Sequence, residues 1–134
     1  MASVLLFEGF SKKIPFVVTE RVYRLFQECS NDLNPLHVND GYSKSHGFRE
    51  CVMYGNILNA FISYAIGMEL PTKDVILLTQ SIQYKKPVYL NDSLIMELRT
   101  ESFSEAGKSV TFKYKFSNNN KIIVAKGDIM IGLI

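Results

Sequence analysis

The sequence predicts an α+β fold in which an antiparallel sheet wraps around one buried central helix. Two patterns support this prediction: residues 56–68 form an almost wholly apolar segment, and apolar residues alternate with polar ones along most of the chain after Pro71. A helix without a hydrophilic face has to be buried, and an antiparallel sheet with one apolar face can cover it. The 134 residues, 47% of them hydrophobic, suit a single domain that spans residues 1–134.

The first half of the chain predicts a strand, an amphipathic helix and a long loop before the buried helix. Residues 13–18 are expected to form the strand, and Thr19 can cap the helix that follows. Residues 30–55 are rich in Asn, Asp, Ser, Gly and His, so we expect a loop with one short helix near residues 40–45. So long an irregular segment in a small domain is typical of a functional site. The first helix repeats its apolar residues at i, i+3, i+4 and i+7, which predicts a core-facing side made of Val22, Leu25, Phe26 and Cys29.

The second half of the chain predicts four antiparallel strands. Turn-forming sequences separate them at residues 91–92, 105–107 and 118–120. The expected order of elements is therefore strand, helix, loop, buried helix and four strands. The alternating apolar residues of the four strands are Ile82 and Tyr84; Leu94, Met96 and Leu98; Val110, Phe112, Tyr114 and Phe116; and Ile122 and Val124, followed by an almost wholly apolar end at residues 129–134.

Charge and hydropathy argue against nucleic-acid and membrane partners. The net charge is only +2, from 15 Lys and Arg against 13 Asp and Glu, and the basic doublets at residues 12–13 and 85–86 lie far apart. The first residues lack the basic region of a signal peptide. Asn59 and Ser63 interrupt the longest apolar stretch, which falls short of the roughly 18 to 20 residues that span a bilayer. We therefore expect a soluble, cytoplasmic protein.

Neither the cysteines nor the histidines form a metal-binding or redox pattern. Cys29 and Cys51 lack C-x-x-C spacing, so we expect both thiols to be reduced and packed in the core. His37 has only carboxylates near it in the sequence, without the second His or Cys that most zinc sites contain. His46 lies beside Lys44 and Gly47 and is expected in solvent. No metal is therefore predicted.

The buried helix carries one narrow polar line. Asn56, Asn59 and Ser63 fall within about 60° of one another around a helix, and Gly67 continues the line. These groups either satisfy the backbone of a loop, as buried polar groups require, or border a ligand cavity, and the spacing leaves both interpretations open. Gly55 precedes the helix, where free first-turn N–H groups can bind an oxyanion.

The strongest local signal is the sequence Ser-Asn-Asp-Leu-Asn-Pro-Leu-His at residues 30–37. Pro35 biases Asn34 away from helical angles and favours a turn, from which Asp32 and His37 can point into one space. A carboxylate and an imidazole placed in this way could hold a water between them and move its proton. The alternative is an Asp-Asn turn with a surface histidine. No G-x-S-x-G or phosphate-binding glycine motif is present.

With these residues the sequence resembles the MaoC-like dehydratase family of the hot-dog fold, and in particular its (R)-specific enoyl-CoA hydratases. The resemblance covers nearly the whole chain, and its most specific motif is D-x-N-P-x-H at residues 32–37, joined by Tyr54-Gly55 and by Lys86-Pro87-Val88 with Asn91-Asp92. It implies reversible hydration of a trans-2-enoyl thioester to an (R)-3-hydroxyacyl thioester, without a cofactor, by a homodimer. Two hot-dog sheets would then join into one.

The resemblance also implies a role for each matching residue. Asp32 and His37 correspond to the catalytic pair that activates water, Gly55 to the residue whose N–H holds the thioester oxygen, and Ser63 to a helix serine that lines the site. Three further residues are expected at the substrate site: Tyr54, Asn59 and Asn34. Asn34 is expected mainly to stiffen the loop.

Three positions depart from the family pattern. Tyr54 stands where the family usually has His, Asn31 where a glycine is common, and Asn39 where Asp is frequent. Asn31 is a mild change, because Asn tolerates the backbone angles of a tight turn. Tyr54 keeps a second reaction open, namely dehydration or thioester hydrolysis on a non-CoA or ACP-linked substrate. A non-catalytic acyl-thioester binding protein is a third possibility, but it would need neither Asp32 nor His37.

Overall fold

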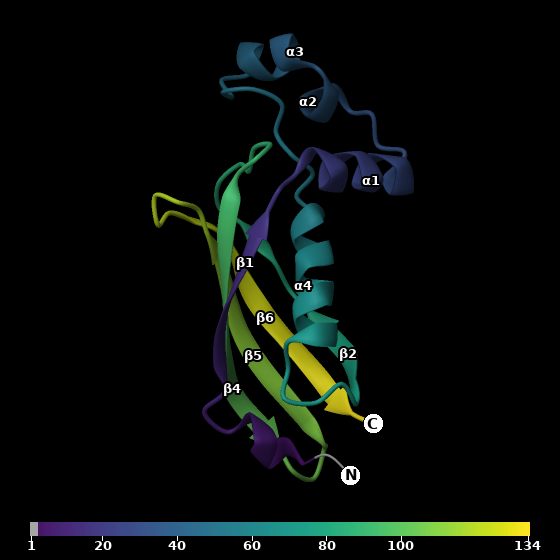
Figure 1. Ribbon diagram of the computed structural model, residues 1–134, viewed down its shortest axis with the longest axis vertical. Helices are drawn as coiled ribbons and strands as arrows, with labels where there is room; N and C mark the ends of the chain where they lie inside the picture. The colour runs from purple at the N-terminus through teal and green to yellow at the C-terminus, as the bar shows by residue number, and fades with distance from the viewer. Residues whose placement is uncertain (1–2) are drawn as a thin grey trace.

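The computed structural model describes residues 3–134 as a curved antiparallel sheet, with the helix of residues 57–68 lying along one face and the helices of residues 20–45 gathered at one end (Figure 1). The helical elements are η1 (Val4–Phe7), α1 (Glu20–Ser30), α2 (Pro35–Val38), α3 (Asp40–Ser45) and α4 (Ile57–Met68). The strands are β1 (Ser11–Val17), β2 (Val75–Gln80), β3 (Gln83–Tyr84), β4 (Ser93–Ser104), β5 (Ser109–Ser117) and β6 (Ile123–Leu133).

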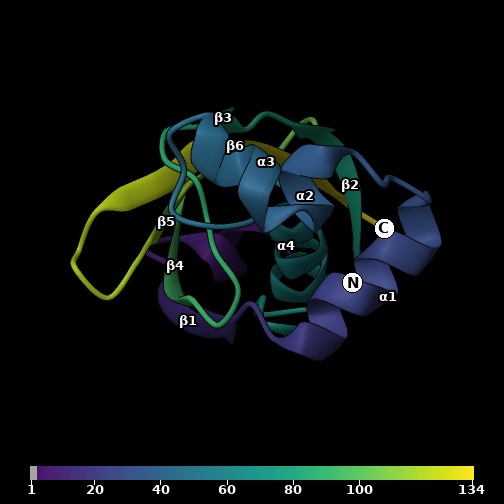
Figure 2. The same cartoon turned by 90° about the horizontal axis from the view of Figure 1, so that it is seen from above.

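The sheet has the order β1-β4-β5-β6-β2, and β3 also pairs with β6. All of its pairings are antiparallel. The inner face is made by alternate residues, as the period-two pattern predicts; in β5 these are Val110, Phe112, Tyr114 and Phe116, each at most 3% exposed. Seen from above, the sheet curves around α4, and α2 and α3 lie over one end of that helix (Figure 2). The predicted α+β architecture is confirmed.

Helix α4 is buried on one side only. Its sheet-facing residues are at most 8% exposed: Ile57, Leu58, Phe61, Ile62, Ala65 and Ile66. Each large apolar side chain buried in this way contributes about 1.5–3 kcal/mol. The opposite side is open, with Tyr64 47% and Met68 56% exposed. The prediction that the whole helix is buried is thus wrong for this side, because one sheet covers only one face of the helix.

Helix α1 begins as predicted but faces differently. The Thr19 hydroxyl accepts a hydrogen bond from the Val22 N–H at 3.1 Å, which caps the helix. However, α1 has no fully buried residue: Leu25 is 53% exposed, and Cys29 is exposed rather than packed in the core. The helix packs mainly through half-buried Val22, Tyr23 and Phe26. Val22 and Phe26 thus pack on the core as predicted, whereas Leu25 and Cys29 do not; the prediction counted only apolar residues and so missed Tyr23, which also packs inward.

Three elements were not predicted: the 3₁₀ helix η1, the short helix α2 and strand β2. The short helix α2 lies inside the expected loop, with Pro35 in its first turn, whereas α3 lies where the short helix was expected. Strand β2 forms one edge of the sheet, so five strands rather than four follow α4. Its run Val-Ile-Leu-Leu does not alternate, which hid it from a search for period two. None of the helices in residues 3–134 is long and apolar enough to cross a membrane.

Candidate active site

A chain of local hydrogen bonds shapes the loop that carries Asp32. Asn31 ends α1 in the left-handed conformation, with φ 55° and ψ 23°, so the residue that replaces the family glycine adopts the backbone that glycine favours. One carboxylate oxygen of Asp32 accepts from the Asn34 N–H at 3.0 Å. The Asn34 side chain in turn accepts from the Leu36 N–H at 2.9 Å and caps α2. Asn34 therefore stiffens the loop.

The same loop brings Asp32 and His37 together. The Nδ1 atom of His37 lies 2.7 Å from the Val52 carbonyl oxygen. A carbonyl oxygen only accepts, so Nδ1 carries the proton and Nε2 of the neutral ring has a free lone pair. Nε2 lies 3.7 Å from Oδ2 of Asp32. This is too long for a direct hydrogen bond, and a water bonded to both atoms would lie to one side of the line between them.

A cleft of about 390 Å³ opens beside His37. Its walls are mostly apolar, as small-molecule sites generally are, and they include Phe48, Met53, Leu58 and Val88. Lys85 and Lys86 also line it. Of the residues expected at the substrate site, only Gly55 joins His37 among the lining residues.

Gly55 presents a free donor at the beginning of α4. In the described part of the chain its N–H has no hydrogen-bond partner, and it precedes the first turn of the helix. A Cβ atom on this residue would lie 2.9 Å from Cε1 of Tyr84, so the Tyr84 ring packs closely over the glycine. Burial is the main cause that raises the pKa of the Tyr84 hydroxyl. Glycine is thus the residue that lets this ring and a ligand approach the same backbone.

The residues of the polar line on α4 differ in whether the protein itself satisfies their hydrogen bonds. The Asn59 side chain donates to Asn56 Oδ1 at 2.7 Å and accepts from the Gln80 side chain, so it is satisfied within the protein. Ser63 is exposed and has no hydrogen-bond partner within residues 3–134. Neither Asn59 nor Ser63 lines the cleft beside His37.

Tyr54 lies behind the pair rather than in the cleft. It is only 3% exposed, its ring is 4.2 Å from that of His37, and its hydroxyl donates to the Asp32 carbonyl at 2.5 Å. Two residues of α1, Tyr23 and Gln27, complete this contact network and were not predicted from the sequence. The only signal for them was their i, i+4 spacing, which places both on one side of the helix.

The MaoC like domain model matches residues 8–120, which include the Asp32–His37 pair and the glycine before α4. The chain belongs to the MaoC-like domain family. Over 117 residues it is 29% identical to the (R)-specific enoyl-CoA hydratase of Rhodospirillum rubrum, an alignment that covers 87% of this chain and 81% of that protein. It is 23% identical to a mitochondrial 3-hydroxyacyl-[acyl-carrier-protein] dehydratase of Arabidopsis thaliana, over 78% of this chain and 64% of that one.

Among solved structures, an R-hydratase from Pseudomonas aeruginosa in its unliganded form superposes with a TM-score of 0.84. Its sequence is 29% identical to this MaoC-like chain, and the match covers 93% of this chain and 80% of that one. The fold is therefore the hot-dog fold, as the resemblance implied.

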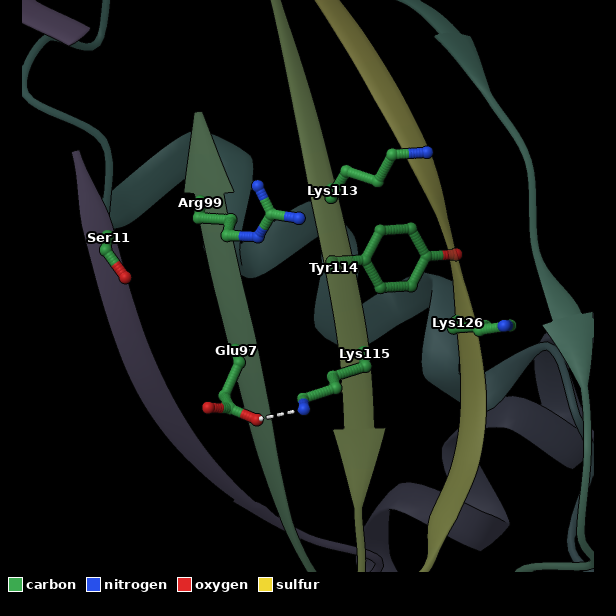
Figure 3. A pocket seen from close by; sticks show the side chains of 7 residues that line it. All are labelled: Ser11, Glu97, Arg99, Lys113, Tyr114, Lys115 and Lys126. Carbon is green, nitrogen blue, oxygen red and sulfur yellow. Dashed lines mark ion pairs between the residues drawn. The ribbon is translucent and has the colours of Figure 1, made fainter. Parts of the chain in front are cut away.

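The MaoC-like domain has a second cavity, of about 290 Å³, on the sheet face opposite α4 (Figure 3). Its cations face carboxylates: Lys115 lies 3.2 Å from Glu97, and Lys113 lies 2.8 Å from Asp128. These pairs reduce the positive charge of the cavity, which is separated from His37 by the sheet. Within residues 3–134, no group of three or more His, Cys, Asp or Glu side chains is placed to hold a metal ion.

Proposed function

We propose that the protein reversibly hydrates a trans-2-enoyl thioester, with coenzyme A as the carrier, to the (R)-3-hydroxyacyl thioester. The observation that carries this proposal is the arrangement of His37 Nε2 and Asp32 Oδ2, two hydrogen-bond acceptors 3.7 Å apart beside an apolar cleft. The (R)-specific enoyl-CoA hydratase of R. rubrum supports it, since that relative matches most of the chain.

Two acceptors orient a water in a way that suits attack. The water donates one hydrogen to Asp32 and one to His37, so its lone pairs point away from both residues. Placed against the substrate, a lone pair attacks C3 while Asp32 takes the proton as general base. His37 accepts a hydrogen bond from the other O–H of the water and so orients it. The remaining hydroxyl bonds to C3, and the protonated Asp32 carboxyl returns its proton to C2 on the same face, which gives syn addition and regenerates the carboxylate.

Negative charge develops on the thioester oxygen as C3 is attacked. The free Gly55 N–H at the beginning of α4 would donate to this oxygen. A donor in such a position is worth about 3–4 kcal/mol of transition-state stabilisation. The resemblance also implies a substrate contact for Ser63, which lies further along α4, outside the cleft beside His37. Only the elements of one water are added to the double bond, so the reaction requires no cofactor.

A second candidate is dehydration of a hydroxyacyl group on acyl carrier protein, which the similarity to the Arabidopsis dehydratase favours.

Incubation with crotonyl-CoA, followed by loss of the enoyl thioester absorbance and by mass spectrometry, tests the proposed hydration. A product heavier by one water supports it. Release of free CoA indicates a thioesterase. If crotonyl-CoA is unchanged while crotonyl-acyl carrier protein is hydrated, acyl carrier protein rather than coenzyme A is the carrier. If neither substrate reacts, the protein is a non-catalytic acyl-thioester binding protein.

We also propose that the protein is a homodimer joined through β2. This strand forms a free edge of the sheet, and Ile76, Leu77 and Leu78 are 51%, 47% and 51% exposed, so both of its faces are open. The other edge, β1, carries Pro15 and two lysines, which disfavour strand pairing. A second β2 would extend the sheet and cover this apolar edge.

Sedimentation equilibrium tests the dimer. The wild type is expected at twice the chain mass of 15.2 kDa at micromolar concentration. Replacing Leu77 by Pro removes a backbone donor from the edge and should shift the protein to the monomer. Leu25→Asp, on the exposed side of α1, is the control and should remain dimeric. A monomeric wild type would refute the proposal.

A further inference from the structure

Tyr54 contacts both members of the Asp32–His37 pair from the interior of the protein. Its hydroxyl donates to the Asp32 carbonyl oxygen at 2.5 Å, and its ring lies at a centroid distance of 4.2 Å from the His37 ring, inclined by 33°. The phenol is 3% exposed, whereas the residue after it, Gly55, faces the cleft. Tyr54 is therefore placed to hold the pair and not to touch a substrate.

Helix α1 fixes this phenol and the backbone of His37. The Gln27 side-chain amide donates to the Tyr54 hydroxyl at 3.2 Å and lies 3.4 Å from the Tyr23 hydroxyl. The Tyr23 hydroxyl in turn donates to the His37 carbonyl oxygen at 2.7 Å. One amide thus joins two phenols, and each phenol holds the backbone carbonyl of one member of the pair.

We propose that Tyr54 is a positioning residue that, together with Gln27 and Tyr23, sets the separation between the Asp32 carboxylate and the His37 imidazole. This role rests on the proposed hydration. The loop itself fixes only local turns, through Asn34 and the cap of α2. The separation between the pair needs a contact from outside the loop, and Tyr54 is the residue that touches both. A displacement of about 1 Å in a catalytic group can cost a hundredfold in rate.

The proposal explains the tyrosine at a position where the family resemblance leads us to expect histidine. An imidazole is shorter than a phenol, so it would not span the distance from the start of α4 to the Asp32 carbonyl in the same way. The pair of Tyr54 and Gln27 is then a matched set: the phenol reaches the loop, and the amide donates to the phenol.

Tyr54→Phe tests the role, because it keeps the ring against His37 and removes only the hydroxyl. The matched control is Tyr114→Phe: Tyr114 is also 3% exposed, and its hydroxyl also donates to a backbone carbonyl, that of Ser81, at 2.6 Å. Each variant loses one buried hydrogen bond to a backbone carbonyl, and Tyr54→Phe also loses the bond from Gln27, so both should lower the melting temperature, Tyr54→Phe somewhat more. Only Tyr54→Phe should lower kcat for crotonyl-CoA hydration, by about tenfold, with KM within about twofold.

Gln27→Leu is the second variant and remains informative if Tyr54→Phe does not fold. It should lower kcat in the same direction. Equal kcat values for Tyr54→Phe and Tyr114→Phe, or an unchanged kcat for Gln27→Leu, would overturn the proposal.

A measurement without substrate separates this proposal from the proposed reaction. The sequence has two histidines, so the ring nitrogen resonances of His37 can be followed by NMR with exposed His46 as an internal reference. The His37 resonances should move or broaden in Tyr54→Phe and stay in place in Tyr114→Phe. If the wild type does not hydrate crotonyl-CoA but the His37 resonances move, the proposed reaction is wrong and the positioning role of Tyr54 is supported. If they do not move, the positioning is wrong.

Discussion

His37 turns its Nε2 atom toward Oδ2 of Asp32 across 3.7 Å because its other ring nitrogen is held by the Val52 carbonyl. The bond to Val52 fixes both the orientation and the tautomer of the ring. His37 is well covered, at 16% side-chain exposure, and Asp32 is more open, at 45%. The carboxylate thus remains accessible to solvent, while the imidazole, which lines the cleft, is kept in place.

We expect Asp32→Asn and His37→Ala each to lower the hydration rate at least about 100-fold, since positioned acid–base groups contribute about that much or more. Asp32 lies in a loop and His37 in a four-residue helix, so circular dichroism should show the wild-type fold in both variants. His46→Ala is the control and should keep full activity, because His46 is exposed at the C-terminal end of α3 and does not line the cleft. A folded Asp32→Asn or His37→Ala variant with near-native turnover would disprove the assigned roles.

Gly55→Ala should lower kcat/KM about tenfold or more, because the new Cβ would lie 2.9 Å from the Tyr84 ring and displace either the ring or the Gly55 N–H. The double variant with Tyr84→Leu frees this space and should recover part of the loss. Steady-state kinetics on crotonyl-CoA measure both. If the double variant is no better than Gly55→Ala alone, the Tyr84 ring is not the cause.

Strong periodic patterns predicted the core of this fold, and a short motif predicted the pair. The alternation in β5 and the apolar segment of α4 reflect burial against many neighbours, so they are visible in the sequence. Asp32 and His37 were predictable because Pro35 and the Asx turns restrict the loop between them.

The remaining features depend on contacts that spacing does not encode. Tyr23 and Gln27 face inward because their polar ends meet the His37 carbonyl and the Tyr54 hydroxyl, and a hydrophobic pattern assigns such residues to solvent. Strand β2 was missed because both of its faces carry apolar side chains, so apolar and polar residues do not alternate. Its residues Ile76, Leu77 and Leu78 are all about half exposed.

Gly127→Ala is expected to be among the most destabilising single substitutions in the sheet. A Cβ at this residue would lie 2.0 Å from the Ser81 carbonyl oxygen and 2.8 Å from the Tyr114 hydroxyl, and the carbonyl belongs to backbone that cannot move alone. We expect a loss of about 2–4 kcal/mol in urea unfolding. Gly132→Ala, in the same strand, meets only side-chain atoms, Leu78 Cδ1 at 3.3 Å and Ile76 Cγ2 at 3.4 Å, and should cost less than about 1 kcal/mol. Equal losses in the two variants would contradict this explanation.

The two cysteines should differ strongly in reactivity, because Cys29 is exposed and Cys51 is not. Burial, followed by the hydrogen bond and charge of Asp40, raises the pKa of the Cys51 thiol to about 11. The thiolate is the reactive form, so at pH 8 only about one Cys51 thiol in a thousand is reactive. Its rate of reaction should rise about tenfold per pH unit until pH approaches 11.

Titration with a thiol reagent should therefore show one fast group, which Cys29→Ser removes. Asp40→Asn takes away a negative charge that opposes ionisation and should speed the reaction of Cys51. Two groups that react equally fast in the wild type, or a Cys51 rate that does not change between pH 7 and pH 9, would show that the thiol is not held in its protonated form.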